Sequence, residues 1–288
     1  MIFGDGREEV INNIKTNAES GNFYAKVETG DPVLSVEDSR AITDSYIENR
    51  DKIGFKIKSL IAVTIANVAT KIVNKNTEII GLEKIPDNIG GMIITSNHFS
   101  PLENTVIRYM LKKKGRRKLD IISQTSNFAM PGMVGFLMNY ADTIPISAEP
   151  RYLARNFFSV IKEKAVTDGD AVLLYPEQEM WFNYRKPRPP RDGAYFYAAK
   201  LGLPIVSCFV EIKDTDEDDN ESFKKVKYIL HILGVLYPDS EKTSRENTEY
   251  LSATDYALKK ECYESVYKKT LTYDFEPSDI AGWKAENA

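Results

Sequence analysis

From residue 80 onward, short apolar runs alternate with stretches of helical periodicity. The runs are rich in β-branched or aromatic residues and bounded by turn residues, as strands are. They lie at 92–95, 120–123, 143–146, 171–175, 204–212 and 226–233, and helical patterns lie at about 101–114, 150–167, 191–201 and 245–269. This alternation predicts an α/β fold with a largely parallel sheet. The acidic stretch 213–222 is predicted to be a solvated hairpin loop.

The first 79 residues lack this alternation of apolar runs and helical patterns. Residues 7–50 suggest short helices broken at Gly21, Gly30 and Pro32. Residues 52–75 then mix apolar residues with lysines, and such a helix lies either in a membrane interface or over the domain's own core. Periodicity does not separate these alternatives. We therefore divide the chain into a helical N-terminal segment, 1–79, that can contact a membrane, and an α/β domain, 80–288.

Bulk composition narrows the classes of function. The chain has 288 residues, 42% of them hydrophobic and 28% charged, which is ordinary for a globular protein. A net charge of -4 argues against nucleic-acid binding through overall positive charge. We expect no signal peptide and no run of about 18–20 apolar residues to cross a bilayer. Cys208 and Cys262 fit reduced cytoplasmic thiols, and no metal-ligand spacing surrounds them.

The candidate chemistry lies in residues 94–104, ITSNHFSPLEN. A predicted strand ends here and a polar corner carries His98, at the end of a sheet where α/β active sites collect. A general-base histidine needs a carboxylate to fix its tautomer, and Glu103 stands five residues on. Ser100, Pro101 and Glu103 also form a helix start with a capping box. The two roles of Glu103 are partly compatible, since a carboxylate has several lone pairs.

Several segments in order resemble motifs of the glycerolipid acyltransferases, the superfamily of the lysophosphatidic-acid (1-acylglycerol-3-phosphate) acyltransferases. NHFSPLE (97–103) is similar to the family's Asn-His, four residues, Asp; LLYPEQEMW (173–181) resembles its Phe-Pro-Glu-Gly-Thr block. ADTIPIS (141–147) and LGLPIVSCFV (201–210) resemble two hydrophobic blocks of the family. Several motifs in order are a specific signal. The resemblance implies a glycerol-3-phosphate acyltransferase-like α/β fold, a mostly parallel mixed sheet flanked by helices.

The resemblance also implies a mechanism. His98 takes the proton of an acceptor hydroxyl, Glu103 stands where the family has aspartate, and the oxygen attacks an acyl thioester. Glu177 matches the motif glutamate that helps to place the acceptor, with Gln178 at the glycine position, and Asn97 precedes the histidine. No cofactor is implied, because acyl-CoA or acyl-acyl-carrier protein serves as co-substrate. The implied acceptor is a lysophospholipid, first of all 1-acylglycerol-3-phosphate.

The sequence departs from the family where an acceptor phosphate is held. Met180 and Ala148 stand where the family has arginines, although Arg151 is close to the second position. Basic residues follow in NYRKPRPPR (183–191), whose prolines favour an extended arm. This arm is predicted to contact a phosphate or an anionic headgroup, a solvated loop being the alternative. The side chains expected to bind the acceptor here are Arg151, Arg185, Lys186 and Arg188.

Two alternatives stay open. Acyl transfer to a glycolipid, an amino lipid or a sugar hydroxyl is the first, because the arginines that hold an acceptor phosphate in the family are missing here. A non-catalytic lipid-binding protein on the same fold would suit the altered glutamate motif, although a binding protein has no need of a general base at His98. We expect a cytoplasmic protein bound peripherally to the inner face of the membrane, with acyl-carrier protein as a candidate partner and no nucleic acid.

Overall fold

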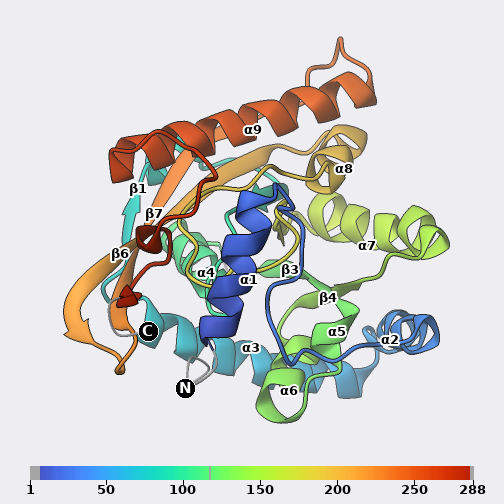
Figure 1. Ribbon diagram of the computed structural model, residues 1–288. Coiled ribbons are helices and arrows are strands. Elements are labelled where there is room, and N and C mark those ends of the chain that lie inside the picture. The colour runs from blue at the N-terminus through green and yellow to red at the C-terminus, as the bar shows by residue number, and fades with distance from the viewer. Residues whose placement is uncertain (1–6, 117, 286–288) are drawn as a thin grey trace.

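The computed structural model describes residues 7–116 and 118–285, and within them a seven-stranded sheet forms the centre of the fold (Figure 1). The strand order is β1-β7-β6-β2-β5-β3-β4. All neighbouring strands run parallel except β6 and β7, which are antiparallel. The strands are β1 (Glu78–Ile80), β2 (Met92–Thr95), β3 (Leu119–Gln124), β4 (Thr143–Ile146), β5 (Ala171–Leu174), β6 (Ile205–Asp218) and β7 (Lys224–Leu236).

The middle of the sheet is buried on both faces. All four residues of β2 and all four of β5 are buried, as expected of parallel strands that helices cover on each side. Ile93 and Ile94 point to opposite faces and belong to different core clusters. Such strands leave continuous apolar runs in the sequence, and the predicted α/β fold with a mostly parallel mixed sheet is confirmed.

One expectation about the strands is wrong, and one strand was not predicted. The acidic stretch 213–222 is not all loop, because β6 continues to Asp218 and β7 resumes at Lys224. This extension is exposed, so its pairing rests on backbone hydrogen bonds and needs no apolar side chains. Strand β1 was not predicted, since three residues beside β7 are too short to show an alternating pattern.

Helices cover both faces of the sheet. On one face α4 contributes Val106 and Met110 to the first core cluster. On the other, Ile161 of α7, Tyr195 of α8 and Leu251 of α9 form the second. Within the described residues the α-helices are α1 (Arg7–Glu19), α2 (Val36–Asn49), α3 (Ile53–Val73), α4 (Asn104–Lys113), α5 (Thr125–Phe128), α6 (Gly132–Tyr140), α7 (Phe158–Ile161, between π-helical turns Tyr152–Phe157 and Lys162–Thr167), α8 (Gly193–Leu201) and α9 (Ser244–Tyr267). Two 3-10 helices span Leu82–Lys84 and Pro277–Asp279.

The first helix packs onto the α/β domain rather than standing apart from it. Its buried residues Val10, Ile11 and Ile14 join a third cluster with side chains from the far end of the chain. That cluster also contains Val27, Trp181, Phe182, Tyr184, Phe223 and Ile280. Helix α1 is therefore held beside residues 181–184, which follow β5.

Helix α3 lies along the side of the molecule away from α9 and contacts α4 and α6 (Figure 1). Its outer face is apolar and exposed, and only 11% of its most apolar stretch is buried. By length and composition α3 meets the requirement for crossing a membrane, whereas no run of sufficient apolar length was expected from the sequence. The exposed side chains include Ile53 (78%), Ile57 (56%), Leu60 (70%) and Ile72 (66%).

Candidate active site

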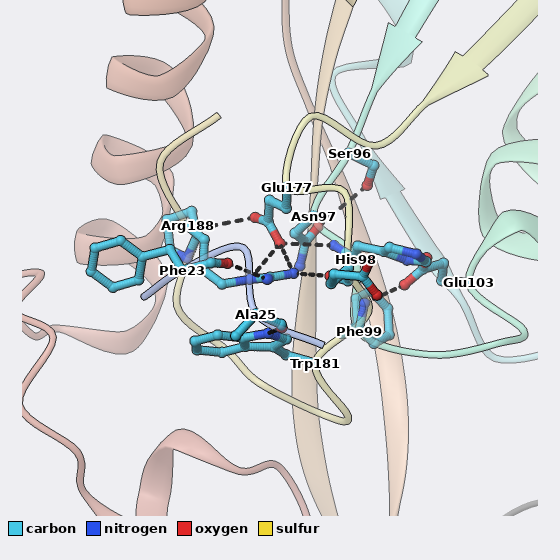
Figure 2. Close-up of polar contacts among 12 residues, drawn as sticks. Phe23, Ala25, Ser96, Asn97, His98, Phe99, Glu103, Glu177, Trp181 and Arg188 are labelled. Atoms are coloured by element: carbon cyan, nitrogen blue, oxygen red, sulfur yellow. Dashed lines mark hydrogen bonds and ion pairs between the residues drawn. The ribbon is translucent and has the colours of Figure 1, made fainter. Parts of the chain in front are cut away.

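Two loops meet at the carboxyl ends of two central strands of the sheet. Strands β2 and β5 are parallel neighbours, so the residues after Thr95 and those after Leu174 emerge side by side. The first loop carries His98 and the second carries Glu177, and Figure 2 shows them in contact. The main-chain N–H of His98 donates to Oε2 of Glu177 at 3.2 Å. His98 and Glu177 therefore both lie at the carboxyl ends of parallel strands, where the sequence pattern placed them.

Glu103 pairs with His98 and also binds the backbone before α4. The predicted capping box is only half formed, because the N–H of Glu103 donates to the carbonyl of Ser100 rather than to its hydroxyl, and α4 begins at Asn104. The Nδ1–H of His98 donates to Oε1 of the carboxylate, and Oε2 accepts from the backbone N–H of Phe99 and of Ser100. Glu103 is only 2% exposed, so these contacts form out of water, where they are strong. The same carboxylate thereby caps the turn before α4 and fixes the tautomer of His98.

The ring of His98 is held on its face as well as its edge. Tyr175 stacks on it, with 4.2 Å between ring centroids and 7° between planes. Burial raises the pKa of Tyr175 well above its usual range, so its phenol is neutral at physiological pH. Glu103 occupies Nδ1, and the His98 side chain remains 21% exposed. Nε2 is therefore the nitrogen available for proton transfer.

Glu177 binds donors of the protein itself, whereas we expected it to help to place the acceptor. It is 4% exposed, and its carboxylate also accepts from the backbone N–H of Arg188 at 3.0 Å and from its Nε at 3.2 Å. With His98 as the further donor, both oxygens face the protein rather than an acceptor. Asn97 likewise ties the loop to β6, exchanging bonds of 3.0 and 2.8 Å with the backbone of Val210. Both residues hold the His98 loop in place.

The prediction that residues 183–191 expose basic side chains to a phosphate is wrong for three of those side chains. Arg188 has no exposed side-chain surface, and Lys186 is 4% exposed and paired with Asp279 at 2.7 Å. Arg185 pairs with Asp214 at 2.5 Å and donates to the carbonyl of Ser278. Residues 185–191 form neither helix nor strand, but carboxylates of the protein itself bind these basic side chains.

Two predicted residues remain at the surface. Arg151 is exposed at the start of the π-helical turn after β4. Gln178 is exposed in a left-handed conformation, φ 65°, that favours the glycine found there in the resembling motif. Sequence reasoning missed Tyr175, although it directly follows β5. Within residues 7–116 and 118–285, no group of three or more His, Cys, Asp or Glu is arranged to hold a metal ion.

Comparison with known proteins agrees with this geometry. Residues 76–211 match the family model described as Acyltransferase, and that range contains His98, Glu103 and Glu177. The chain therefore contains an acyltransferase domain. No curated protein matches the sequence of this acyltransferase.

A solved structure shares the fold of the acyltransferase. It is the 1-acyl-sn-glycerophosphate (LPA) acyltransferase, PlsC, from Thermotoga maritima, with a TM-score of 0.51 and 15% sequence identity. The match covers 92% of this chain and 98% of that chain. At this identity the likeness concerns the fold alone, and it supports the predicted fold class.

Proposed function

We propose that this acyltransferase transfers a fatty-acyl group from an acyl thioester to a lysophospholipid hydroxyl, with His98 as general base. The observation that carries the proposal is the buried Glu103 carboxylate on Nδ1 of a partly exposed His98. Nε2 takes the hydroxyl proton while the oxygen attacks the thioester carbonyl. The tetrahedral intermediate then expels the thiolate, which receives the proton from the imidazolium. Glu103 stabilises that imidazolium, and no acyl-enzyme or cofactor is needed.

The acceptor to test first is 1-acylglycerol-3-phosphate, since the Thermotoga maritima protein of the same fold is named for it. The donor is acyl-CoA or acyl-acyl-carrier protein. One observation favours a second class of acceptor, a glycolipid, an amino lipid or a sugar hydroxyl. The basic side chains expected to bind phosphate, Arg185, Lys186 and Arg188, all have protein partners.

The test is thiol release from acyl-CoA with a panel of lysophospholipids and uncharged acceptors. Acceptor-dependent release with a lysophospholipid is the expected result, and the acylated product is identified by mass. Release only with an acceptor that lacks phosphate would assign the second class instead. Binding of the lipids without release from acyl-CoA or acyl-acyl-carrier protein would contradict catalysis and indicate a lipid-binding protein.

We infer further that the acyltransferase binds the inner face of the membrane through α3. The exposed residues Ile57 and Leu60 support this, because each large apolar side chain moved into lipid contributes roughly 1.5–3 kcal/mol. Lysines on and beside the helix are suited to anionic headgroups. They are Lys52, Lys56, Lys58, Lys71 and Lys75.

Flotation with liposomes of phosphatidylcholine and phosphatidylglycerol measures this binding. Replacing Ile57 and Leu60 together by aspartate is expected to weaken it about 100-fold or more, since both apolar contacts are lost. The matched control is Tyr250→Asp, an exposed aromatic residue (43%) on α9. Equal flotation of the wild-type chain and the α3 double variant would rule out this face as the anchor.

A further inference from the structure

A segment outside the matched acyltransferase range reaches the active site. Residues 22–31, which follow α1 and are called the strap below, pass beside residues 181–188 (Figure 2). The carbonyl of Phe23 accepts from Nη1 of Arg188 at 2.8 Å, and the carbonyl of Ala25 accepts from Nε1 of Trp181 at 3.0 Å. The strap therefore binds two side chains of the loop that follows β5.

The strap is itself firmly attached. Val27 is fully buried, and its carbonyl accepts from Nδ2 of Asn13 on α1 at 3.2 Å. Glu28 pairs with Arg7 at 2.7 Å, and the guanidinium of Arg7 lies 4.3 Å from the centroid of the Phe182 ring. The apolar face of α1 and these polar contacts together hold the strap carbonyls in place.

Arg188 connects the strap to Glu177. Its Nε and backbone N–H donate to the Glu177 carboxylate, and Nη2 lies 3.0 Å from Oε2. Nη2 also donates to the carbonyl of Glu179, and the guanidinium lies 4.4 Å from the centroid of the Trp181 ring. The planar guanidinium thus binds a carboxylate and two carbonyls in fixed directions, which the single ammonium of lysine does not reproduce.

Glu177 and the main chain of Trp181 bind the main chain of His98 on both sides. Its N–H donates to Glu177 at 3.2 Å, and its carbonyl accepts from the backbone N–H of Trp181 at 3.0 Å. Both partners are contacted by Arg188 or by the strap. The position of the imidazole therefore depends on contacts beyond Glu103 and Tyr175.

We propose that Arg188, held by the N-terminal strap, is a positioning residue for His98. It fixes Glu177 and the Trp181 loop against the main chain of the catalytic histidine, and so sets the distance between Nε2 and the acceptor hydroxyl. A displacement of about 1 Å at a reacting group costs on the order of 100-fold in rate. The kinetic part rests on the proposed function, whereas the position of the ring is measurable without turnover.

The kinetic test compares Arg188→Lys with Arg116→Lys. Arg116 also donates to two backbone carbonyls, those of Ile89 and Gly169. It lies just before β3, however, at the amino ends of the parallel strands, whereas His98 lies at their carboxyl ends. We expect Arg188→Lys to lower kcat about 10- to 100-fold with little change in KM, and Arg116→Lys to leave both unchanged. Wild-type kcat in folded Arg188→Lys would overturn the proposal.

Trp181→Phe supplies a milder variant if Arg188→Lys does not fold. It removes the hydrogen bond to the carbonyl of Ala25 while keeping an aromatic ring beneath the guanidinium. We expect kcat to fall about 3- to 10-fold, because one hydrogen bond between the strap and the loop is lost. An unchanged kcat in this variant would count against the strap's part in positioning.

Histidine NMR tests the positioning independently of turnover, because the chain has only two histidines, His98 and His231. His231 is bound to Glu211 at 2.9 Å and serves as an internal reference. In Arg188→Lys, or in Trp181→Phe, the His98 ring signals are expected to shift while those of His231 stay. Unshifted His98 signals would overturn the proposal. Shifted signals in a protein that acylates no acceptor would contradict the proposed function alone.

Discussion

Replacing His98 by alanine is expected to lower the rate of acyl transfer by about 10²- to 10⁴-fold, the usual contribution of a general base. The substitution removes the Nε2 lone pair that accepts the hydroxyl proton. It leaves the backbone bonds of residue 98 to Glu177 and Trp181 in place, so the loop keeps its anchors. The measurement is acceptor-dependent thiol release under saturating donor.

The matched control is the other histidine. His231 is also partly buried and bound to a carboxylate, Glu211, but it lies on β7. His231→Ala is expected to retain the wild-type rate per folded molecule. A His98→Ala variant that is folded and transfers acyl groups at a rate close to wild type would refute the general-base role.

Glu103→Gln is expected to lower the rate by about 100-fold and also to destabilise the fold. A glutamine has no charge to stabilise the imidazolium of His98. Its single amide oxygen also cannot replace both carboxylate oxygens, which accept from the histidine ring and from the N–H groups of Phe99 and Ser100. A buried donor left without a partner costs about 1–3 kcal/mol. Rate and thermal midpoint are measured on the same preparations.

Glu211→Gln separates the two effects of that substitution. It alters the equivalent pair, in which Glu211 lies 2.9 Å from Nε2 of His231. We expect some loss of stability with no loss of rate. If Glu103→Gln lost stability but kept the wild-type rate per folded molecule, Glu103 would be a helix-capping residue only.

The pairing of His98 with Glu103 was predictable because it is local. His98 and Glu103 lie five residues apart, and the strand before them and the turn after them leave clear patterns in the sequence. The buried strands β2 and β5 were predictable for a similar reason, since burial on both faces demands unbroken apolar runs. Short-range chemistry and continuous burial are what a single sequence reveals most directly.

Contacts between distant segments were not predictable. Arg188 and Phe23 are separated by 165 positions and meet through a backbone carbonyl, which every residue possesses. The partners of Arg185 and Lys186 are likewise distant carboxylates, so their basic side chains suggested a ligand instead. Helices α5 and α6 were missed because residues 125–140 are apolar without clear periodicity and contain Pro131 and Gly132.

The third core cluster bears on the order in which the chain acquires its native structure during synthesis. Ile11 and Ile14 are translated before the strands of the sheet, yet they share a core cluster with Phe223 and Ile280, which are translated much later. Chains generally fold from the N-terminal side as they are made, but α1 must wait for these partners. The sheet and the His98 corner can assemble earlier, whereas docking of the strap belongs to the last stage of folding. In a nascent chain the strap would therefore stay undocked until Ile280 has been translated.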